Sequence, residues 1–140
     1  MEWSIGILRR FGWINKVGGL AAAKYFFEVK VTILVTLFNF ALQMRIIARS
    51  TLREFWEKHA DAETPLKSWF GAVKKAEWKS FNQLKHQFGN ASVVGNDRVV
   101  FNIKGNDYRL VAAIDYEKQI LWIRFVGTHK AYDKIDAKAI

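Results

Sequence analysis

Residues 99–126 read VVFNIKGNDYRLVAAIDYEKQILWIRFV, and this stretch decides the fold class. From Val99 to Ile103 apolar side chains alternate across two faces, with Asn102 on the second face, and a period of two is typical of a strand. Residues 104–107, Lys-Gly-Asn-Asp, are the residue types of a hairpin turn. Further strands are predicted over 108–116 and 120–126, joined by a turn at 117–119. The stretch therefore predicts consecutive antiparallel strands.

Two sets of apolar residues at helical spacing precede these strands. The sets are Leu52, Phe55, Trp56 and His59, followed by Leu66, Trp69, Phe70 and Val73. Each follows the pattern i, i+3, i+4, i+7 of a helix packed on a core, so we expect core packing rather than RNA stacking from the aromatic members. We expect Ser50 or Thr51 to cap the first helix, with Thr51 and Glu54 as a capping box. The second helix is expected to begin at Thr64-Pro65.

Three shorter elements complete the pattern. A strand is predicted over 45–48, a helix from Ser80 to Phe88 that ends at Gly89-Asn90, and a short helix over 130–137. The predicted order from Met44 is a strand, two or three helices, three or four antiparallel strands and a final helix. This order predicts an α+β fold, in which two or three helices pack on a small antiparallel sheet and a short helix ends the chain.

Composition narrows the class of protein. The chain has 140 residues, a formal charge of +9 and a pI near 9.9, with 51% hydrophobic and 25% charged residues. These proportions exclude a wholly disordered chain and suit one modest domain. The absence of cysteine excludes disulfides, thiolate zinc sites and a cysteine nucleophile, and three histidines make a His-rich metal cage unexpected. The basic charge indicates a polyanionic partner, such as nucleic acid, a ribosome or a membrane surface.

Residues 1–43 differ from the rest of the chain. The uncharged run VTILVTLFNFALQM, residues 31–44, is 14 residues long, whereas a membrane-spanning helix needs about 20. Lys30, Glu28 and Lys24 precede it, and no small residue stands where a signal peptidase would cut. Two interpretations stay open: a membrane or export segment, or an apolar extension translated from too early a start, with Met44 as the natural first residue. We favour the second and predict a domain boundary between 1–43 and 44–140.

Polar residues of the predicted sheet are the first candidates for chemistry. By strand alternation Arg109 lies opposite the Tyr108, Leu110 and Ala112 face, and Arg124 lies opposite the Leu121, Ile123 and Phe125 face. Two arginines and Asn102 are therefore expected on one side of the sheet. The alternative is that they are ordinary solvent-facing residues of a half-buried sheet.

A second polar set follows the last predicted strand. It is Thr128-His129-Lys130 with Tyr132 and Asp133. A histidine can transfer protons, while lysine, arginine and tyrosine can hold a phosphate, although a lone histidine is more often structural. His59 belongs to a helix stripe and His86 to a helix surface, so neither is a candidate. No phosphate-binding glycine loop, nucleophile elbow or zinc-binding helix pair occurs in the sequence.

Several motifs together resemble the HigB family of toxin–antitoxin toxins, within the RelE-like superfamily. They are Val-Phe-Asn-Ile at 100–103, Gly105-Asn106, Tyr108-Arg109-Leu110, the closing Thr128-His129-Lys130-x-Tyr132-Asp133, the opening Met44-Arg45-Ile46-Ile47, and Trp69-Phe70 to Trp78. The resemblance covers 44–140, and residues 1–43 have no counterpart in the family pattern. It implies a RelE-like fold, a small twisted antiparallel sheet with helices packed on one side.

The resemblance also implies an activity and partners. HigB toxins are endoribonucleases that cut mRNA, usually on translating ribosomes, to arrest translation and growth. The resemblance implies a helix-turn-helix antitoxin (HigA-like), operator DNA bound only through that antitoxin, and a cytoplasmic protein with no membrane partner. The implied reaction uses neither metal nor cofactor: the ribose 2′-hydroxyl attacks the adjacent phosphate, leaving a cyclic phosphate and a 5′-hydroxyl.

Roles are carried over residue by residue as expectations of the resemblance. The expected catalytic residues are Arg109 for phosphate stabilisation, His129 as general acid or base, and Tyr132 beside it. The expected RNA-binding residues are Lys104, Asn102, Asn106, Arg124 and Lys130, although Gly105-Asn106 serve equally well as turn residues. Two alternatives remain: a non-catalytic RNA- or ribosome-binding module that blocks translation, and a membrane-attached protein that uses residues 17–43.

Overall fold

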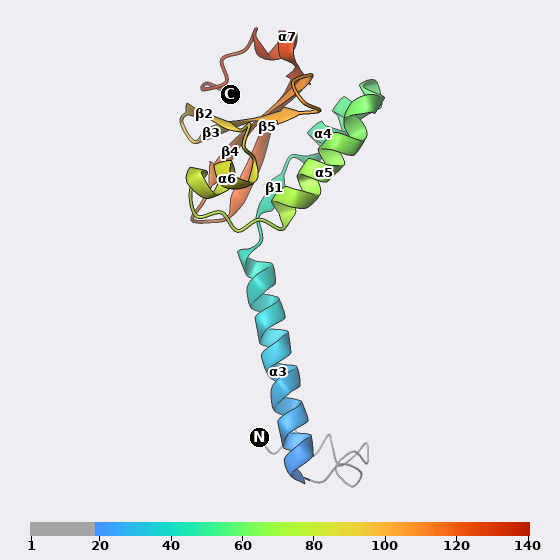
Figure 1. The fold of residues 1–140 in the computed structure, drawn as a ribbon, viewed down its shortest axis with the longest axis vertical. Helices are drawn as coiled ribbons and strands as arrows, with labels where there is room; N and C mark the ends of the chain where they lie inside the picture. Colours follow the sequence, from blue (N-terminus) through green and yellow to red (C-terminus); the bar gives the residue numbers. More distant parts are fainter. Residues whose placement is uncertain (1–18) are drawn as a thin grey trace. The chain divides into compact units, whose positions relative to one another are not determined.

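The computed structural model describes residues 19–140 of the chain (Figure 1). These residues belong to two compact units, Met1–Ala41 and Leu42–Ile140, and each is considered by itself. The first 18 residues of the predicted N-terminal extension lie outside the described residues. The domain boundary between residues 43 and 44 and the natural start at Met44 stay predictions.

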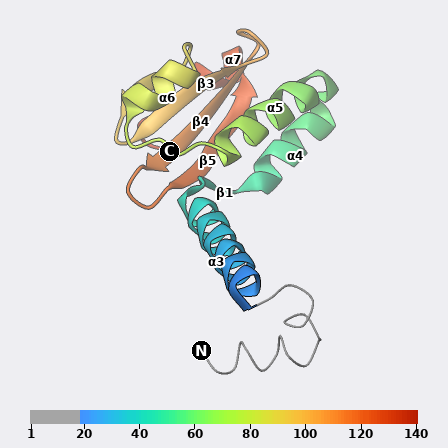
Figure 2. The ribbon, with the colours of Figure 1, turned by 60° about the horizontal axis from the view of Figure 1, so that its bottom comes forward.

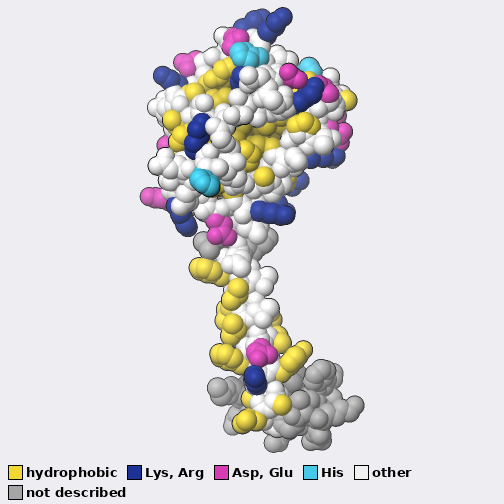
Figure 3. Space-filling model, in the orientation of Figure 1, with side chains coloured by type: hydrophobic (Ala, Val, Ile, Leu, Met, Phe, Trp, Pro, Cys, Tyr) yellow, Lys and Arg dark blue, Asp and Glu magenta, His cyan; other side chains and the backbone are white. Residues whose placement is uncertain are grey.

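A single helix, α3, covers Gly19–Leu42. Its large apolar side chains are more than half exposed at Leu20, Tyr25, Phe27, Ile33, Leu34, Val35, Leu37 and Phe38. Apolar side chains therefore cover much of the helix surface in Figure 3, rather than one narrow stripe. Within residues 19–140, no helix combines the length and apolar character that crossing a bilayer requires.

The second unit is built on a five-stranded sheet in the order β1-β5-β4-β3-β2. The strands are β1 Arg45–Ile47, β2 Ser92–Gly95, β3 Arg98–Ile103, β4 Tyr108–Asp115 and β5 Ile120–Thr128. β2 to β5 pair antiparallel through tight turns, as predicted. β1 pairs parallel to β5, because a long connection through helices, unlike a tight turn, allows two neighbouring strands to run in the same direction.

Helices cover one face of this sheet. They are α4 Arg49–Lys58, the 3-10 turn η1 Ala60–Ala62, α5 Glu63–Lys74 and α6 Phe81–Gln87. Figure 2 shows α4 and α5 side by side near the β1 edge, and α6 beyond them. Leu52, Leu66, Trp69 and Val73 are buried in the main core, with Phe55, Trp56 and Phe70 packed against it. The predicted helix stripes and the α+β fold class are therefore confirmed.

The predicted starts of α4 and α5 are wrong. α4 begins at Arg49 after Ala48, whose φ of 68° is left-handed, and no side chain caps it, so the Thr51–Glu54 capping box does not form. α5 begins at Glu63 because η1 leads directly into it, and this places Thr64 and Pro65 inside the first turn. Proline is tolerated there, since the first-turn N–H groups have no helical acceptor.

The other face of the sheet is covered by the C-terminal segment. The helix α7 covers only His129–Tyr132, shorter than the predicted 130–137. The chain leaves the helix because Ile135 and Ala137 pack on Val100 and Val111, in a small second core cluster.

A bulge in β5 changes the predicted alternation. Val111 pairs with Phe125 but Ala112 pairs with Ile123, so Arg124 is an extra residue in β5. Phe125 therefore packs with Val100 and Val111 in the second cluster, while Ile123 remains in the main core. The expectation that Phe125 shares a face with Leu121 and Ile123 is wrong, because a bulge shifts every later side chain to the opposite face.

Candidate active site

The turn between β3 and β4 is the centre of the candidate site. Residues 104–107 form it, and Lys104 and Gly105 both have positive φ, 51° and 66°. The Asp107 N–H closes the turn on the Lys104 carbonyl at 3.2 Å. A left-handed conformation has no steric cost for Gly105 but is strained for Lys104. Such strain at a non-glycine residue persists only where surrounding contacts hold it.

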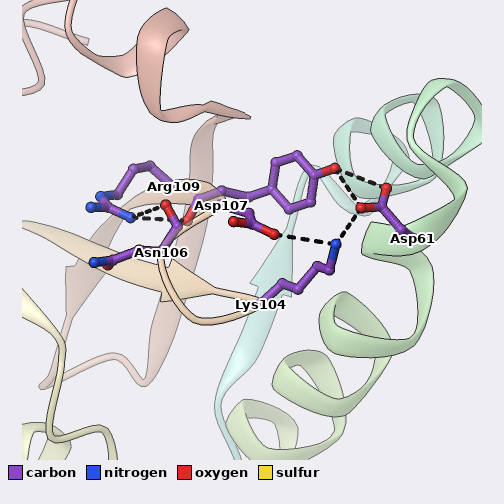
Figure 4. A network of polar contacts seen from close by, with 6 residues as sticks. Asp61, Lys104, Asn106, Asp107 and Arg109 are labelled. Atoms are coloured by element: carbon purple, nitrogen blue, oxygen red, sulfur yellow. Dashed lines mark hydrogen bonds and ion pairs between the residues drawn. The ribbon is translucent and has the colours of Figure 1, made fainter.

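Arg109 lies directly beside this turn. It faces Asn102 across the β3–β4 pair, and its side chain is 9% exposed. Its Nη1 donates to the Asn106 carbonyl at 3.1 Å and to the Tyr108 carbonyl at 3.4 Å, and Asn102 Nδ2 donates to Asn106 Oδ1 at 3.1 Å. Figure 4 shows the guanidinium and the Asn106 side chain at the same turn.

The guanidinium of Arg109 has no ion pair within residues 19–140. A buried cation is costly unless an anion compensates it. Guanidinium groups bind phosphate oxygens through paired N–H donors. An uncompensated guanidinium at a strand end is therefore suited to receive a phosphate.

Gly127 is the β5 residue opposite Arg109, and it has no room for a side chain. A Cβ atom there would lie 2.4 Å from Phe125 Cζ. The Phe125 ring therefore lies over Gly127, the position that pairs with Arg109.

His129 begins α7 at the same end of the sheet. Thr128 caps the helix by accepting a hydrogen bond from the Ala131 N–H, and the His129 N–H donates to the Asp107 carbonyl at 3.2 Å. The imidazole Nδ1 lies 3.0 Å from Asp133 Oδ2, and both side chains are about half exposed. A carboxylate on Nδ1 orients the ring and leaves Nε2 free to accept or donate a proton.

Asp61 joins the helices to the turn. It accepts hydrogen bonds from Lys104 Nζ at 2.5 Å and from Tyr108 Oη at 2.8 Å, and Lys104 also pairs with Asp107 at 3.2 Å (Figure 4). The hydrogen bonds from Lys104 and Tyr108 lower the pKa of Asp61 below its usual value. The hydrogen bond to Asp61, and after it the one to Asp107, raises the pKa of Lys104 to about 12. The hydrogen bond to Asp61 and burial raise the pKa of Tyr108.

Asp61 was missed by sequence reasoning. It lies 43 positions before Lys104, in the short connection between two helices, and no local pattern marks it. Its contacts also change the interpretation of Lys104, whose ammonium is engaged by two carboxylates rather than free for RNA.

The predicted site residues fall into three groups. Asn102, Asn106, Arg109 and His129 gather around the β3–β4 turn, while exposed Lys130 follows His129 in α7. Tyr132 packs against the second core cluster, at the i+3 position from His129. Arg124 does not join them, because it lines a separate pocket with Asp97, Arg98 and Asp115. Within residues 19–140, no group of three His, Asp or Glu side chains could hold a metal ion.

The Asp61 carboxylate has an expected effect on acid stability. Its pKa is lowered in the folded protein, so its contribution is present above its usual pKa of 3.8 and is lost as the pH falls through the lower folded value. Asp61→Asn should remove this dependence, so the variant is expected to lose less stability than the wild type on acidification. Urea unfolding between about pH 6 and about pH 2.5 measures it.

Asp107→Asn is the matched control, since it removes a carboxylate from the same lysine but keeps the Tyr108 acceptor. We expect the loss of stability on acidification to differ less from the wild type in this control than in Asp61→Asn. Parallel loss of stability in the wild type and Asp61→Asn on acidification would contradict the prediction.

Sequence comparisons identify the family to which this chain is similar. The sequence profile of the HigB toxins, described as the RelE-like toxic component of a toxin–antitoxin system, matches residues 62–135. The chain is 33% identical over 92 residues to the mRNA interferase toxin HigB of Escherichia coli K12, covering 64% of this chain and 88% of the relative. The same values hold for the mRNA interferase HigB of Shigella flexneri.

A more distant relative is the mRNA interferase HigB of Escherichia coli O6:H1, 22% identical over 94 residues, covering 66% of this chain and 91% of the relative. The profile match includes the β3–β4 turn, Arg109 and His129. The family resemblance inferred from the sequence motifs is confirmed. The chain belongs to the HigB family of RelE-like toxins of toxin–antitoxin systems.

Proposed function

We propose that this chain is an mRNA interferase, an endoribonuclease that cleaves mRNA and is inhibited by an antitoxin. The observation that carries the proposal is a nearly buried guanidinium, without a carboxylate partner among residues 19–140, at the same turn that binds the backbone of His129. One group is suited to hold a phosphate and the other to move a proton. RNA cleavage by the 2′-hydroxyl needs both functions.

In the proposed reaction, His129 Nε2 accepts the proton of a ribose 2′-hydroxyl. The O2′–P bond forms, and Arg109 stabilises the negative charge that grows on the phosphate oxygens. The P–O5′ bond breaks, and the leaving 5′ oxygen takes a proton from Tyr132, which lies one helical turn from His129. The products are a 2′,3′-cyclic phosphate and a 5′-hydroxyl. Proton transfer through solvent from the His129 imidazolium to the Tyr132 phenolate then restores both side chains, so the reaction is balanced without a metal or a cofactor.

Supporting roles follow from position. Asn102 and Asn106 lie beside Arg109 and would position the RNA backbone, and exposed Lys130 would attract it. Lys104 would act on RNA only when it leaves its carboxylate partners. Arg124, in its separate pocket, would contact a more distant part of the RNA.

We further propose mRNA on the translating ribosome in the cytoplasm as the substrate. The proposed inhibitor is a HigA-like helix-turn-helix antitoxin, through which alone the complex binds operator DNA. Support comes from family membership and from the basic charge of +9. We propose residues 44–140 as the toxin domain, in which the Met44 side chain is 2% exposed.

Primer extension on cellular mRNA after induction of the full chain tests the proposal. New 5′ ends inside coding sequences are expected, and co-expression of the cognate antitoxin should remove them. Growth arrest without new ends would instead support the RNA- or ribosome-binding module that blocks translation by occupancy.

A further inference from the structure

A second cationic and aromatic feature lies between α4 and α5, away from the candidate active site. A cavity of about 580 Å³ opens there. Its lining residues are Arg49, Ser50, Leu52, Arg53, Trp56, Lys67 and Phe70. Figure 2 shows the two helices side by side, and η1, which carries Asp61, joins them at one end. Arg49 and Phe70 lie toward the opposite end of the helix pair. Because residues of both α4 and α5 line this cavity, we name it the helix-pair pocket.

The charged residues that line the helix-pair pocket are all basic. Three of its seven lining residues are cationic, and none is acidic. Lys67 pairs with Glu63 at 2.5 Å, which compensates its charge. Arg49 and Arg53 have no ion pair within residues 19–140. Two guanidinium groups are therefore available to an anion.

Aromatic rings form the walls of the same pocket. The Arg49 guanidinium carbon lies 4.4 Å from the Phe70 ring centroid, and the Lys67 ammonium lies 5.5 Å from that of Trp56. Both rings are only partly buried against the main core, while Leu52 is 2% exposed and forms an apolar floor. A guanidinium that lies over a ring has several N–H donors, so it can contact the ring and still bind an anion.

We propose that the helix-pair pocket binds one nucleotide of single-stranded RNA, outside the site of cleavage. A nucleobase would pack on Trp56 or Phe70, and its phosphate would bind Arg49 and Arg53. Base–aromatic stacking combined with a cationic surface is the chemistry by which proteins bind single-stranded RNA. A volume of about 580 Å³ is in the range of pockets that bind small ligands.

The identity of the ligand as RNA rests on the proposed function, but the site is separate from the reacting groups. Asp61 reaches the active-site turn from the connection between α4 and α5. Arg53 lies in α4, five residues before this helix ends at Lys58, which is about 7.5 Å along the helix axis. A single RNA strand could therefore contact both places, and the pocket would increase affinity for long RNA without taking part in cleavage.

Binding of a 2′-O-methyl RNA oligonucleotide, which cannot be cleaved, tests the proposal by fluorescence anisotropy with the full chain. The double variant Arg49→Gln/Arg53→Gln is expected to weaken binding at least tenfold and to reduce the slope of log K against log salt by about one to two. Lys74→Gln/Lys75→Gln is the control, because it removes two exposed charges of the same region outside the pocket. It should weaken binding much less.

Trp56→Leu tests the stacking contact and is expected to weaken RNA binding by about five- to hundredfold. Trp56→Phe, which keeps an aromatic ring, should restore most of the affinity, and a thermal melt of each variant checks folding. Equal loss of affinity in the lysine control and the arginine variant would overturn the proposal.

An acidic peptide serves as the competing probe. If poly-glutamate binds as tightly as RNA, and Trp56→Leu leaves RNA affinity unchanged, the pocket binds an acidic protein segment and the RNA proposal is wrong. These measurements do not depend on cleavage. A chain that shows the expected binding losses but generates no new mRNA ends would retain the pocket and refute the interferase function.

Discussion

His129→Ala is expected to lower the rate of RNA cleavage by about 100- to 10,000-fold, the range for loss of a general acid or base. The imidazole is half exposed and Asp133 lies 3.0 Å from its Nδ1, so its Nε2 is left to exchange a proton with a 2′-hydroxyl. The His129 backbone is bound to the turn beside Arg109, which places proton transfer and phosphate binding at one end of the sheet. Single-turnover cleavage of a synthetic mRNA fragment measures the effect.

His86→Ala is the matched control for this variant. His86 is also exposed, but it lies in α6 and outside the candidate site, so its removal should leave the cleavage rate unchanged. Asp133→Asn, which disturbs the orientation of the ring but keeps its position in α7, is expected to reduce the rate by less than His129→Ala. Wild-type rates for His129→Ala would show that this histidine is structural.

Local periodicity was sufficient to predict the elements around this site. The stripes that include Leu52 and Leu66 identify α4 and α5, because a buried helix face needs apolar residues every three or four positions. The strand alternation also places Arg109 opposite the main core and beside Asn102. These features depend on neighbours within one element or one hairpin.

Features that depend on distant partners could not be predicted. The bulge at Arg124 is set by the pairing of β5 with β4, and alternation within β5 alone gives the wrong face for Phe125. Asp61 reaches Lys104 and Tyr108 across 43 and 47 positions. The early end of α7 reflects the packing of Ala137 on the sheet, which intrinsic helix preference does not contain.

Arg109→Met is expected to lower cleavage by about 100- to 1,000-fold, as for the loss of one preorganised donor to a developing oxyanion. The loss should appear mainly in kcat, because negative charge on the phosphate oxygens grows in the transition state and the ground state gains less from the guanidinium. Arg109→Lys keeps the charge but loses the planar pair of donors, so it should recover only part of the activity. Steady-state kinetics on a short RNA measure both variants.

The same substitution separates a catalytic role from a structural one. Arg109 is 9% exposed and has no carboxylate partner within residues 19–140, so it is a buried charge that folding alone does not favour. Replacing it with methionine, an apolar chain of similar length, is expected to maintain or increase the urea midpoint while cleavage is lost. If Arg109→Met unfolds the protein and Arg109→Lys restores stability and activity together, the guanidinium holds the β3–β4 turn rather than the phosphate. A stable variant without activity would instead show that the fold maintains an uncompensated charge at this strand end for an anion that arrives with the substrate.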